Sequence, residues 1–415
     1  MEDVSAIFST DVLIIGAGPA GAAAAFYAAK QGLSALLIDA ASFPRDKTCG
    51  DGLTPRAMHQ LEKIGLAKQI TQRYSSRGLK LHGFGGSIEA PWPQSTFGDV
   101  GSAMRRTEFD NLLVQHALAQ DGVTGWFGAE AGEPTLAHGQ ISEVQVRVDG
   151  VVKRVHPRYV IVADGVRSTF GKLLGRRWHR GEVYGIAARS YCSTPKSDEP
   201  WIHSHLELRS SDGDVQPGYG WIFPLGTGYA NVGCGALSTD ARPARVNTKK
   251  LLRSYAASVR EEWQLGEPEN VASALLPMGG AVSGVAGPNW ALIGDAAACV
   301  NPLNGEGIDY ALETAELAIK LCSQGKDLSL VWTFTLRQHY GEAFLLARTL
   351  ARALTYPQFL PVFGPVGLRV PGVMNSAARL MGNLITDEDR DVVARVWRGA
   401  GHLLASRRHS TPLWS

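Results

Sequence analysis

Residues 10–39 read TDVLIIGAGPAGAAAAFYAAKQGLSALLID, and this stretch decides the fold. Its first apolar run, Val12–Ile15, is short and uncharged, as buried strands are, and Ala35–Ile38 is a second run of the same kind. An alanine-rich segment long enough for a helix separates the two runs, and Asp39 stands at the end of the second. Strand, helix, strand and terminal acid in this order predict a βαβ unit.

Three glycines between the first strand and the helix indicate what this unit binds. Gly16, Gly18 and Gly21 form a Gly-x-Gly-x-x-Gly motif. The first permits a tight turn, the second lets the backbone approach a pyrophosphate, and the third lets helix and strand pack closely. The helix N-terminus offers N–H groups to the phosphates, and Asp39 would accept hydrogen bonds from a ribose diol. The N-terminal region therefore predicts a dinucleotide site.

The whole chain has the composition of an ordered globular protein. It contains 415 residues, enough for two or three structural units, with 45% hydrophobic and 19% charged residues. The formal net charge is only +2. Because this charge provides no strong basic field, we expect no nucleic-acid partner.

The positions of cysteine and histidine argue against disulfides and metal sites. His203 and His205 would share one face of a strand, but no third ligand is expected nearby, so we expect no metal. The five cysteines are odd in number and scattered without a CxxC pair, which suggests a reducing cytoplasm. They are Cys49, Cys192, Cys234, Cys299 and Cys322.

We expect a cytoplasmic protein without a membrane span. Residues 1–9 are too short and too acidic for a signal peptide. The apolar stretches 271–303 and 354–368 are interrupted by prolines, whereas a spanning helix needs about 20 apolar residues. Residues 356–381 are apolar and proline-rich, and residues 396–409 mix apolar with basic side chains. These two segments either pack as a helical subdomain or lie peripherally on the anionic inner face of the cell membrane.

Two further strand ends carry an acid beside a glycine. One predicted buried strand ends in Asp164-Gly165. Another ends in Asp295, and a turn that contains Gly305 and Gly307 then leads into a helix. Such a turn lets the backbone approach a ligand, and the helix N-terminus stabilises negative charge. As at the first site, an acid and a flexible turn at a strand end indicate a place for a ligand.

Two other segments are candidates for a pocket. The loop 43–56 follows the βαβ unit at the edge of the sheet where ligands bind. Its Cys49 is either a small buried apolar residue or a thiol made reactive by neighbouring basic residues. Tyr219 and Trp221 belong to a section with the alternation of antiparallel strands, residues 183–235. They form either ordinary sheet core or the wall of an apolar pocket.

These separate motifs have a common explanation. The chain resembles the geranylgeranyl reductase family of flavoproteins over nearly its whole length, most clearly in residues 43–56, 219–224 and 276–310. The resemblance implies an α/β fold, α+β overall, of the para-hydroxybenzoate hydroxylase type. We therefore expect a Rossmann-like FAD-binding domain, an antiparallel-sheet substrate domain and a C-terminal helical region. Their expected ranges are 1–77, 101–180 and 273–327 for FAD binding, 78–100 and 181–272 for the substrate domain, and 328–415 for the helical region.

The same resemblance assigns individual residues to the cofactor, FAD. Gly16, Gly18 and Gly21 would bind the pyrophosphate, and Asp39 would bind the adenosine ribose. Arg106 stands at the start of a predicted helix, where it is either merely solvated or reaches the phosphate or ribityl region of FAD.

At the flavin end, the resemblance places Asp164 and Gly165 beside the ring and Asp295 on the ribityl chain. The turn before the helix would direct backbone N–H groups at the pyrimidine edge of the flavin. Its residues assigned to the cofactor are Gly305, Gly307 and Ile308.

Catalytic residues are implied where the flavin meets the substrate. Cys49 and Gly50 belong to a loop that faces both, and Tyr219 and Trp221, followed by Phe223, would line a lipid pocket. Cys49, or a water that it positions, is the expected proton source.

The implied activity is hydrogenation of a C=C bond in a polyprenyl side chain, with the side chain of menaquinone as the expected substrate. An isolated trisubstituted alkene is not electrophilic, so hydride from N5 of reduced FAD must be matched by a proton on the other carbon. No second Gly-x-Gly-x-x-Gly motif is present, so an external electron donor is expected to reduce the flavin.

Three alternatives stay open. The chain could act on another prenyl lipid. It could be an FAD-dependent monooxygenase or halogenase, although Ala298 stands where hydroxylases of this fold usually carry histidine. It could also be a lipid cyclase or isomerase that uses reduced flavin without net redox change.

Overall fold

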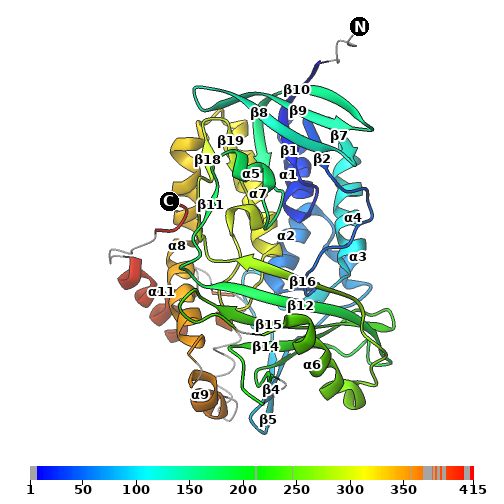
Figure 1. Cartoon of the computed structure of the whole chain (residues 1–415), viewed down its shortest axis with the longest axis vertical. Coiled ribbons are helices and arrows are strands. Elements are labelled where there is room, and N and C mark those ends of the chain that lie inside the picture. The colour runs from blue at the N-terminus through cyan, green and yellow to red at the C-terminus, as the bar shows by residue number, and fades with distance from the viewer. Residues whose placement is uncertain are drawn as a thin grey trace.

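The computed structural model describes residues 7–210, 213–244, 246–356, 358–367, 376, 379–380, 384–385, 389–405 and 412–415. Two β-sheets dominate this part of the chain, one above the other in Figure 1, with helices packed around them. The upper sheet contains the predicted βαβ unit, and the lower sheet is almost entirely antiparallel. The expected fold class is therefore confirmed.

The upper sheet has eight strands among the described residues and is parallel around β1. Its path is β18–β19–β10–β1–β2–β7, and β9 continues it from β10 in antiparallel orientation and pairs with β8. The strands are β1 (Ile7–Ile15), β2 (Ala35–Asp39), β7 (Val123–Phe127), β8 (Glu130–Ala137), β9 (Gln140–Val148), β10 (Val151–Val162), β18 (Ala286–Gly287) and β19 (Trp290–Leu292).

The register of these strands gathers the predicted motifs at one edge. Ile15 at the end of β1 pairs with Ile38 of β2 and with Val162 of β10, and β19 continues the parallel arrangement beside β10. The carboxyl ends of four parallel strands therefore meet, at the place where open α/β sheets bind ligands. The residues at these ends are Gly16, Asp39, Asp164 and Asp295.

Helices pack against the upper sheet. α1 (Pro19–Lys30) buries nearly all its alanines, so that it packs closely against β1, α4 (Arg106–Leu118) and α7 (Ile308–Ser323). The other short elements here are α2 (Pro55–Ile64), α3 (Ala67–Thr71), α5 (Thr169–Leu173), the 3₁₀ turn Gly294–Ala297, and the paired strands β3 (Gly52–Leu53) with β6 (Ser102–Ala103) and β11 (Arg177–Trp178) with β17 (Val282–Ser283).

The lower sheet has seven strands among the described residues, in the order β16–β12–β15–β14–β13–β4–β5. One of its faces packs against α6 (Thr248–Trp263) and forms a second apolar core. The predicted antiparallel strands are confirmed. The strands are β4 (Gly78–Gly83), β5 (Gly86–Pro91), β12 (Tyr184–Ser193), β13 (Trp201–His205), β14 (Gly218–Pro224), β15 (Tyr229–Ser238) and β16 (Glu269–Pro277).

One expected domain boundary falls inside a strand. The border expected between residues 272 and 273 lies within β16, which pairs with β12 as far as Pro277. The antiparallel sheet therefore extends about five residues further than its sequence pattern indicated, because the alternation fades where the strand approaches the glycines that follow it.

The described part of the C-terminal region is helical. α8 (Leu328–Leu354) runs along one side of both sheets, α11 (Val392–Ala405) lies at its outer side, and α9 (Phe359–Gly367) lies below its end (Figure 1). Trp414 returns to the core, where its indole N–H donates to the carbonyl of Ala297 at 2.7 Å. Most of the segment 368–381 and residues 406–411 of the predicted membrane-contact region lie outside the described residues. In the described residues we find no helix with the length and hydropathy of a membrane span.

Candidate active site

A single cavity of about 1210 Å³ extends from the glycine turn of the upper sheet to the lower sheet. It passes the loop that contains Cys49 and ends against α9, and residues of the glycine-rich turn before α7 also line it. Every cofactor and catalytic residue predicted from the sequence lines this cavity, with one exception: Gly21 packs behind the turn.

The glycine turn has the geometry that a dinucleotide requires. Gly16 has φ +101°, and a Cβ there would stand 2.4 Å from the carbonyl oxygen of Ala163. A Cβ on Gly21 would stand 1.7 Å from the carbonyl oxygen of Gly16. Gly18 borders the cavity, and a Cβ there would meet only the tip of Arg45, at 3.4 Å. Since α1 begins here without a side-chain cap, its N–H groups suit a pyrophosphate.

The acid at the end of β2 is held by the backbone. Asp39 accepts hydrogen bonds at 2.8 Å from the N–H groups of Ala17 and Ala41, and Arg45 lies 3.8 Å away. Its carboxylate therefore faces the turn that would hold the adenosine half of FAD.

Arg106 is engaged within its own helix. Its guanidinium forms two hydrogen bonds with Asp110, at 2.6 and 2.8 Å. Asp110 also accepts from Arg45 at 2.8 Å. Arg106 thus borders the same cavity as Cys49, while part of its charge is already neutralised.

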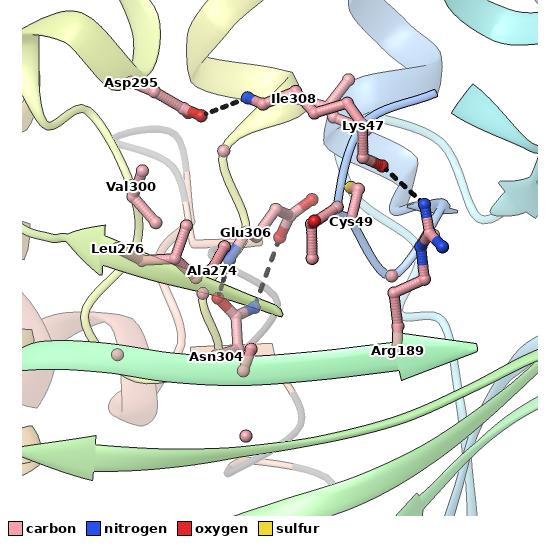
Figure 2. Close-up of a pocket in the computed structure, with 18 of the residues that line it drawn as sticks. Lys47, Cys49, Arg189, Ala274, Leu276, Asp295, Val300, Asn304, Glu306 and Ile308 are labelled. Atoms are coloured by element: carbon pink, nitrogen blue, oxygen red, sulfur yellow. Dashed lines mark hydrogen bonds and ion pairs between the residues drawn. The ribbon is translucent and has the colours of Figure 1, made fainter. Parts of the chain in front are cut away.

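The two remaining acids of the predicted motifs differ in their partners. Asp164 accepts a hydrogen bond from the N–H of Phe170 at 2.8 Å, and burial raises the pKa of Asp164. Asp295 forms an ion pair at 2.8 Å with Lys47, which crosses the cavity in Figure 2. Although burial opposes it, this ion pair lowers the pKa of Asp295, so Asp295 remains a carboxylate. No sequence pattern indicated that Lys47 would be this partner, because it is 248 residues away.

The loop with Cys49 is anchored from the lower sheet. Arg189 of β12 is fully buried and donates to the carbonyl of Lys47 at 3.1 Å (Figure 2). It also forms an ion pair with Asp46. The basic residues that neighbour Cys49 in the sequence each pair with a carboxylate. Those pairs are Arg45 with Asp110, Lys47 with Asp295 and Arg56 with Glu313.

The aromatic strand β14 forms a wall of the cavity. Tyr219 donates its hydroxyl hydrogen to the carbonyl of Asn304 at 2.6 Å, and the indole N–H of Trp221 donates to Asn231 at 2.9 Å. A Cβ on Gly50 would stand 2.8 Å from the ring of Phe223. Gly50 therefore lets the Cys49 loop lie directly on this wall.

Two buried acids in the cavity wall were not assigned a role from the sequence. Asp51 is completely buried below Cys49 and accepts from Asn231 at 2.9 Å. Burial raises the pKa of Asp51 to about 6, although the hydrogen bond from Asn231 opposes the shift. Glu306 lies in the turn between Gly305 and Gly307. An acid between two glycines at a helix N-terminus was the available signal.

The histidines of the lower sheet have a neighbour that the sequence pattern missed. His82 of β4 stacks on both His203 and His205, and its Nε2 lies 3.0 Å from Nδ1 of His203. The parallel pairing of β4 with β13 brings it there from more than a hundred residues away. Burial lowers the pKa of His205 to about 3. In the described part of the chain no group of three or more metal-ligating side chains has the arrangement to hold a metal ion.

Comparison with known proteins agrees with this geometry. The family model "FAD binding domain" matches residues 9–326. A menaquinone reductase from Mycolicibacterium smegmatis is 53% identical over 405 residues, which are 96% of this chain and 97% of the relative. Digeranylgeranylglycerophospholipid reductase 1 from Methanopyrus kandleri is 30% identical over 319 residues, 74% of this chain and 79% of the relative.

A solved structure confirms the fold independently. A geranylgeranyl bacteriochlorophyll reductase-like protein from Thermoplasma acidophilum superimposes with a TM-score of 0.74 at 19% identity, covering 96% of this chain and 98% of that one. At this identity the likeness establishes the fold alone.

Proposed function

The chain belongs to the FAD-binding domain family and to its geranylgeranyl reductase branch, and we propose that it hydrogenates a C=C bond in the polyprenyl side chain of menaquinone. FAD is its cofactor. Identity above 50% to a menaquinone reductase, over nearly the full length of both chains, supports this substrate.

The observation that carries the proposal is that one cavity joins a dinucleotide cradle to an apolar chamber. The far half of this cavity is lined by aliphatic and aromatic side chains, which suit a prenyl chain. They include Leu79, Leu81, Trp92, Leu276, Met278, Phe359, Leu360 and Phe363. A flavin held by the glycine turn would point toward this chamber, past Cys49.

In this reaction bound FAD, once reduced by an external electron donor, supplies the hydride. The protein orients the prenyl chain along β14, excludes water with its apolar wall, and holds the cofactor through the glycine turn and the paired charges described above.

We assign Cys49, Tyr219 and Trp221 to the place where the prenyl chain crosses the flavin. Cys49→Ala should lower the rate by more than about tenfold, roughly 1.4 kcal/mol, because the thiol borders both ligands. Single-turnover kinetics measure this change. Cys322→Ala, a buried thiol of α7 that does not line the cavity, is the matched control. Loss of less than tenfold in Cys49→Ala would remove the thiol from the catalytic set.

The product mass tests the activity. Menaquinone extracted from a host without side-chain saturation should gain two mass units in its prenyl tail when this chain is expressed. No gain, with FAD bound as shown by its absorbance, would keep the fold and reject this substrate. A gain of two mass units in a different prenyl lipid would indicate that this lipid is the substrate. One added oxygen would indicate a monooxygenase. An unchanged mass with an altered structure would indicate a cyclase or isomerase.

We further propose that α9 brings the cavity to an anionic membrane surface at the inner face of the cell membrane. α9 (Phe359–Gly367) carries no charged residue, and Val362 and Phe363 are more than half exposed, at 59% and 58%. Phe359 and Leu360 of the same helix line the cavity, so the surface patch and the chamber are continuous. A lipid substrate could therefore enter without crossing water.

Vesicle flotation tests this surface. With Val362→Asp and Phe363→Asp combined, binding to anionic phospholipid vesicles should fall at least tenfold, because two charges would replace the apolar contact. Leu330→Asp changes an even more exposed apolar position, 76% exposed at the opposite end of α8, and should bind as the wild type does. Equal binding by all three proteins would contradict the proposal.

A further inference from the structure

Glu306 presents a carboxyl group to the cavity beside Cys49 and Tyr219. It lies between Gly305, which has φ +77°, and Gly307, which precedes α7. Figure 2 shows its side chain extending from this turn toward Cys49. Glu306, Cys49 and Tyr219 all line the same cavity, and the Tyr219 hydroxyl donates to the carbonyl of Asn304, two residues before Glu306.

The partners of this carboxyl group are neutral. The Thr54 hydroxyl donates to one of its oxygens, and the side-chain amide of Asn304 donates to the other at 3.4 Å. The N–H of Glu306 donates to Asn304 at 2.8 Å, and the Glu306 carbonyl accepts from the N–H of Asn301 at 2.7 Å. These bonds fix the side chain without supplying a counter-charge.

The charged groups near Glu306 lie behind it. Arg56 of α2 forms ion pairs with Glu313 at 2.7 Å and with Asp309 at 3.6 Å. Burial, together with the charge of Asp309, raises the pKa of Glu306 well above its ordinary value, although Arg56 opposes this. Although burial opposes it, the Arg56 ion pair lowers the pKa of Glu313. Burial in this setting favours the protonated carboxyl group over the carboxylate.

Saturation of an isolated alkene needs such a proton. Tyr219 is a weaker source, since its hydroxyl hydrogen is directed at the carbonyl of Asn304 and burial raises the pKa of the phenol. Glu306 instead faces an apolar chamber in which a neutral acid is stable and its anion is held by the hydroxyl of Thr54 and the amide of Asn304.

We propose that Glu306 is the general acid of the reaction, an assignment that rests on the proposed function. The Oε–H bond of Glu306 breaks, and its proton forms a C–H bond with the less substituted alkene carbon at the expense of the C=C π pair. The hydride supplied by the reduced cofactor forms the second C–H bond at the more substituted carbon, where positive charge develops. Glu306 is left as a carboxylate and takes a proton from water before the next turnover.

Glu306→Gln separates this role from folding and from cofactor binding. The variant should bind FAD as the wild type does, and the reduced protein should transfer hydrogen to menaquinone at least about 100-fold more slowly, as expected for a lost general acid. Glu306→Asp should recover part of the rate. Glu316→Gln on the exposed side of α7, where Glu316 pairs with Lys63, is the matched control and should leave the rate unchanged.

Infrared spectroscopy provides a readout that does not depend on turnover. The wild-type minus Glu306→Gln difference spectrum of the protein at pH 7 should contain the C=O band of a protonated carboxylic acid. Absence of this band, or a Glu306→Gln rate within threefold of the wild type, would overturn the assignment. If the wild type itself saturates no menaquinone, the proposed function fails and the assignment fails with it, which the wild-type product alone reveals.

Discussion

The two ends of the cavity differ in the charge of the side chains that line them. At the glycine turn, charged side chains are numerous but already paired, as in Arg106 with Asp110 and Lys47 with Asp295. At the far end the lining is aliphatic and aromatic. A pyrophosphate therefore binds among preorganised polar groups. A prenyl chain binds in an apolar chamber, where burying apolar surface away from water lowers the free energy. Reduction of an unactivated alkene needs both environments within one space.

The largest effect, loss of FAD binding, is expected at Gly16, where the polar end of the cavity has no room for a side chain. Gly16→Ala should abolish FAD binding, because the positive φ costs about 1–3 kcal/mol and the new Cβ would clash with the carbonyl of Ala163. The FAD absorbance per chain and urea denaturation measure the two effects. Gly32→Ala is the matched control, since Gly32 has φ +70° with open space around it. Gly16→Ala should lose FAD while Gly32→Ala retains it; retention by both would show that the turn does not hold the cofactor.

A smaller effect is expected at the junction of the two ends. Burial raises the pKa of Asp51 to about 6, so the folded state binds a proton more tightly than the unfolded chain. The contribution of Asp51 to stability should therefore be fully present below pH 4 and be lost as the pH rises from about 4 to 6, by up to about 3 kcal/mol. Asp51→Asn should lack this fall, which urea denaturation across the pH range measures. Parallel profiles for the two proteins would mean that Asp51 is not buried.

The apolar end can be tested with one charge. Leu276→Glu should raise the KM for the lipid by about tenfold or more without loss of FAD, because a carboxylate in the chamber opposes the prenyl chain. Leu275→Glu is the matched control, since Leu275 directly precedes Leu276 in β16 and is 52% exposed on the other face of the strand. Steady-state kinetics of both variants measure the two KM values. Equal KM values would place the lipid elsewhere.

Local sequence patterns predicted the parts of this site that are local in origin. The apolar runs of β1 and β2, the glycines between them and the acid at Asp39 are all within 30 residues, and their structure follows from short-range geometry. The glycine-rich turn before α7 was predicted for the same reason.

Contacts across long sequence separations were beyond prediction. Lys47 and Asp295 are 248 residues apart, and His82 meets His203 only because β4 pairs with β13. The polar partners that neutralise the basic residues around Cys49 likewise come from α4, α7 and the end of β19. The role of Glu306 depends on which way one side chain points, which no periodicity in the sequence records.

The most direct test of the account is a single turnover with the purified protein. FAD-loaded protein, reduced and freed of excess reductant without oxygen, should be reoxidised by menaquinone, and one prenyl double bond should be saturated per flavin. A quinone with the same ring and a fully saturated tail should leave the flavin reduced. Reoxidation by both quinones, with the tail of menaquinone unchanged in mass, would contradict the claim that the apolar chamber presents an alkene to the flavin.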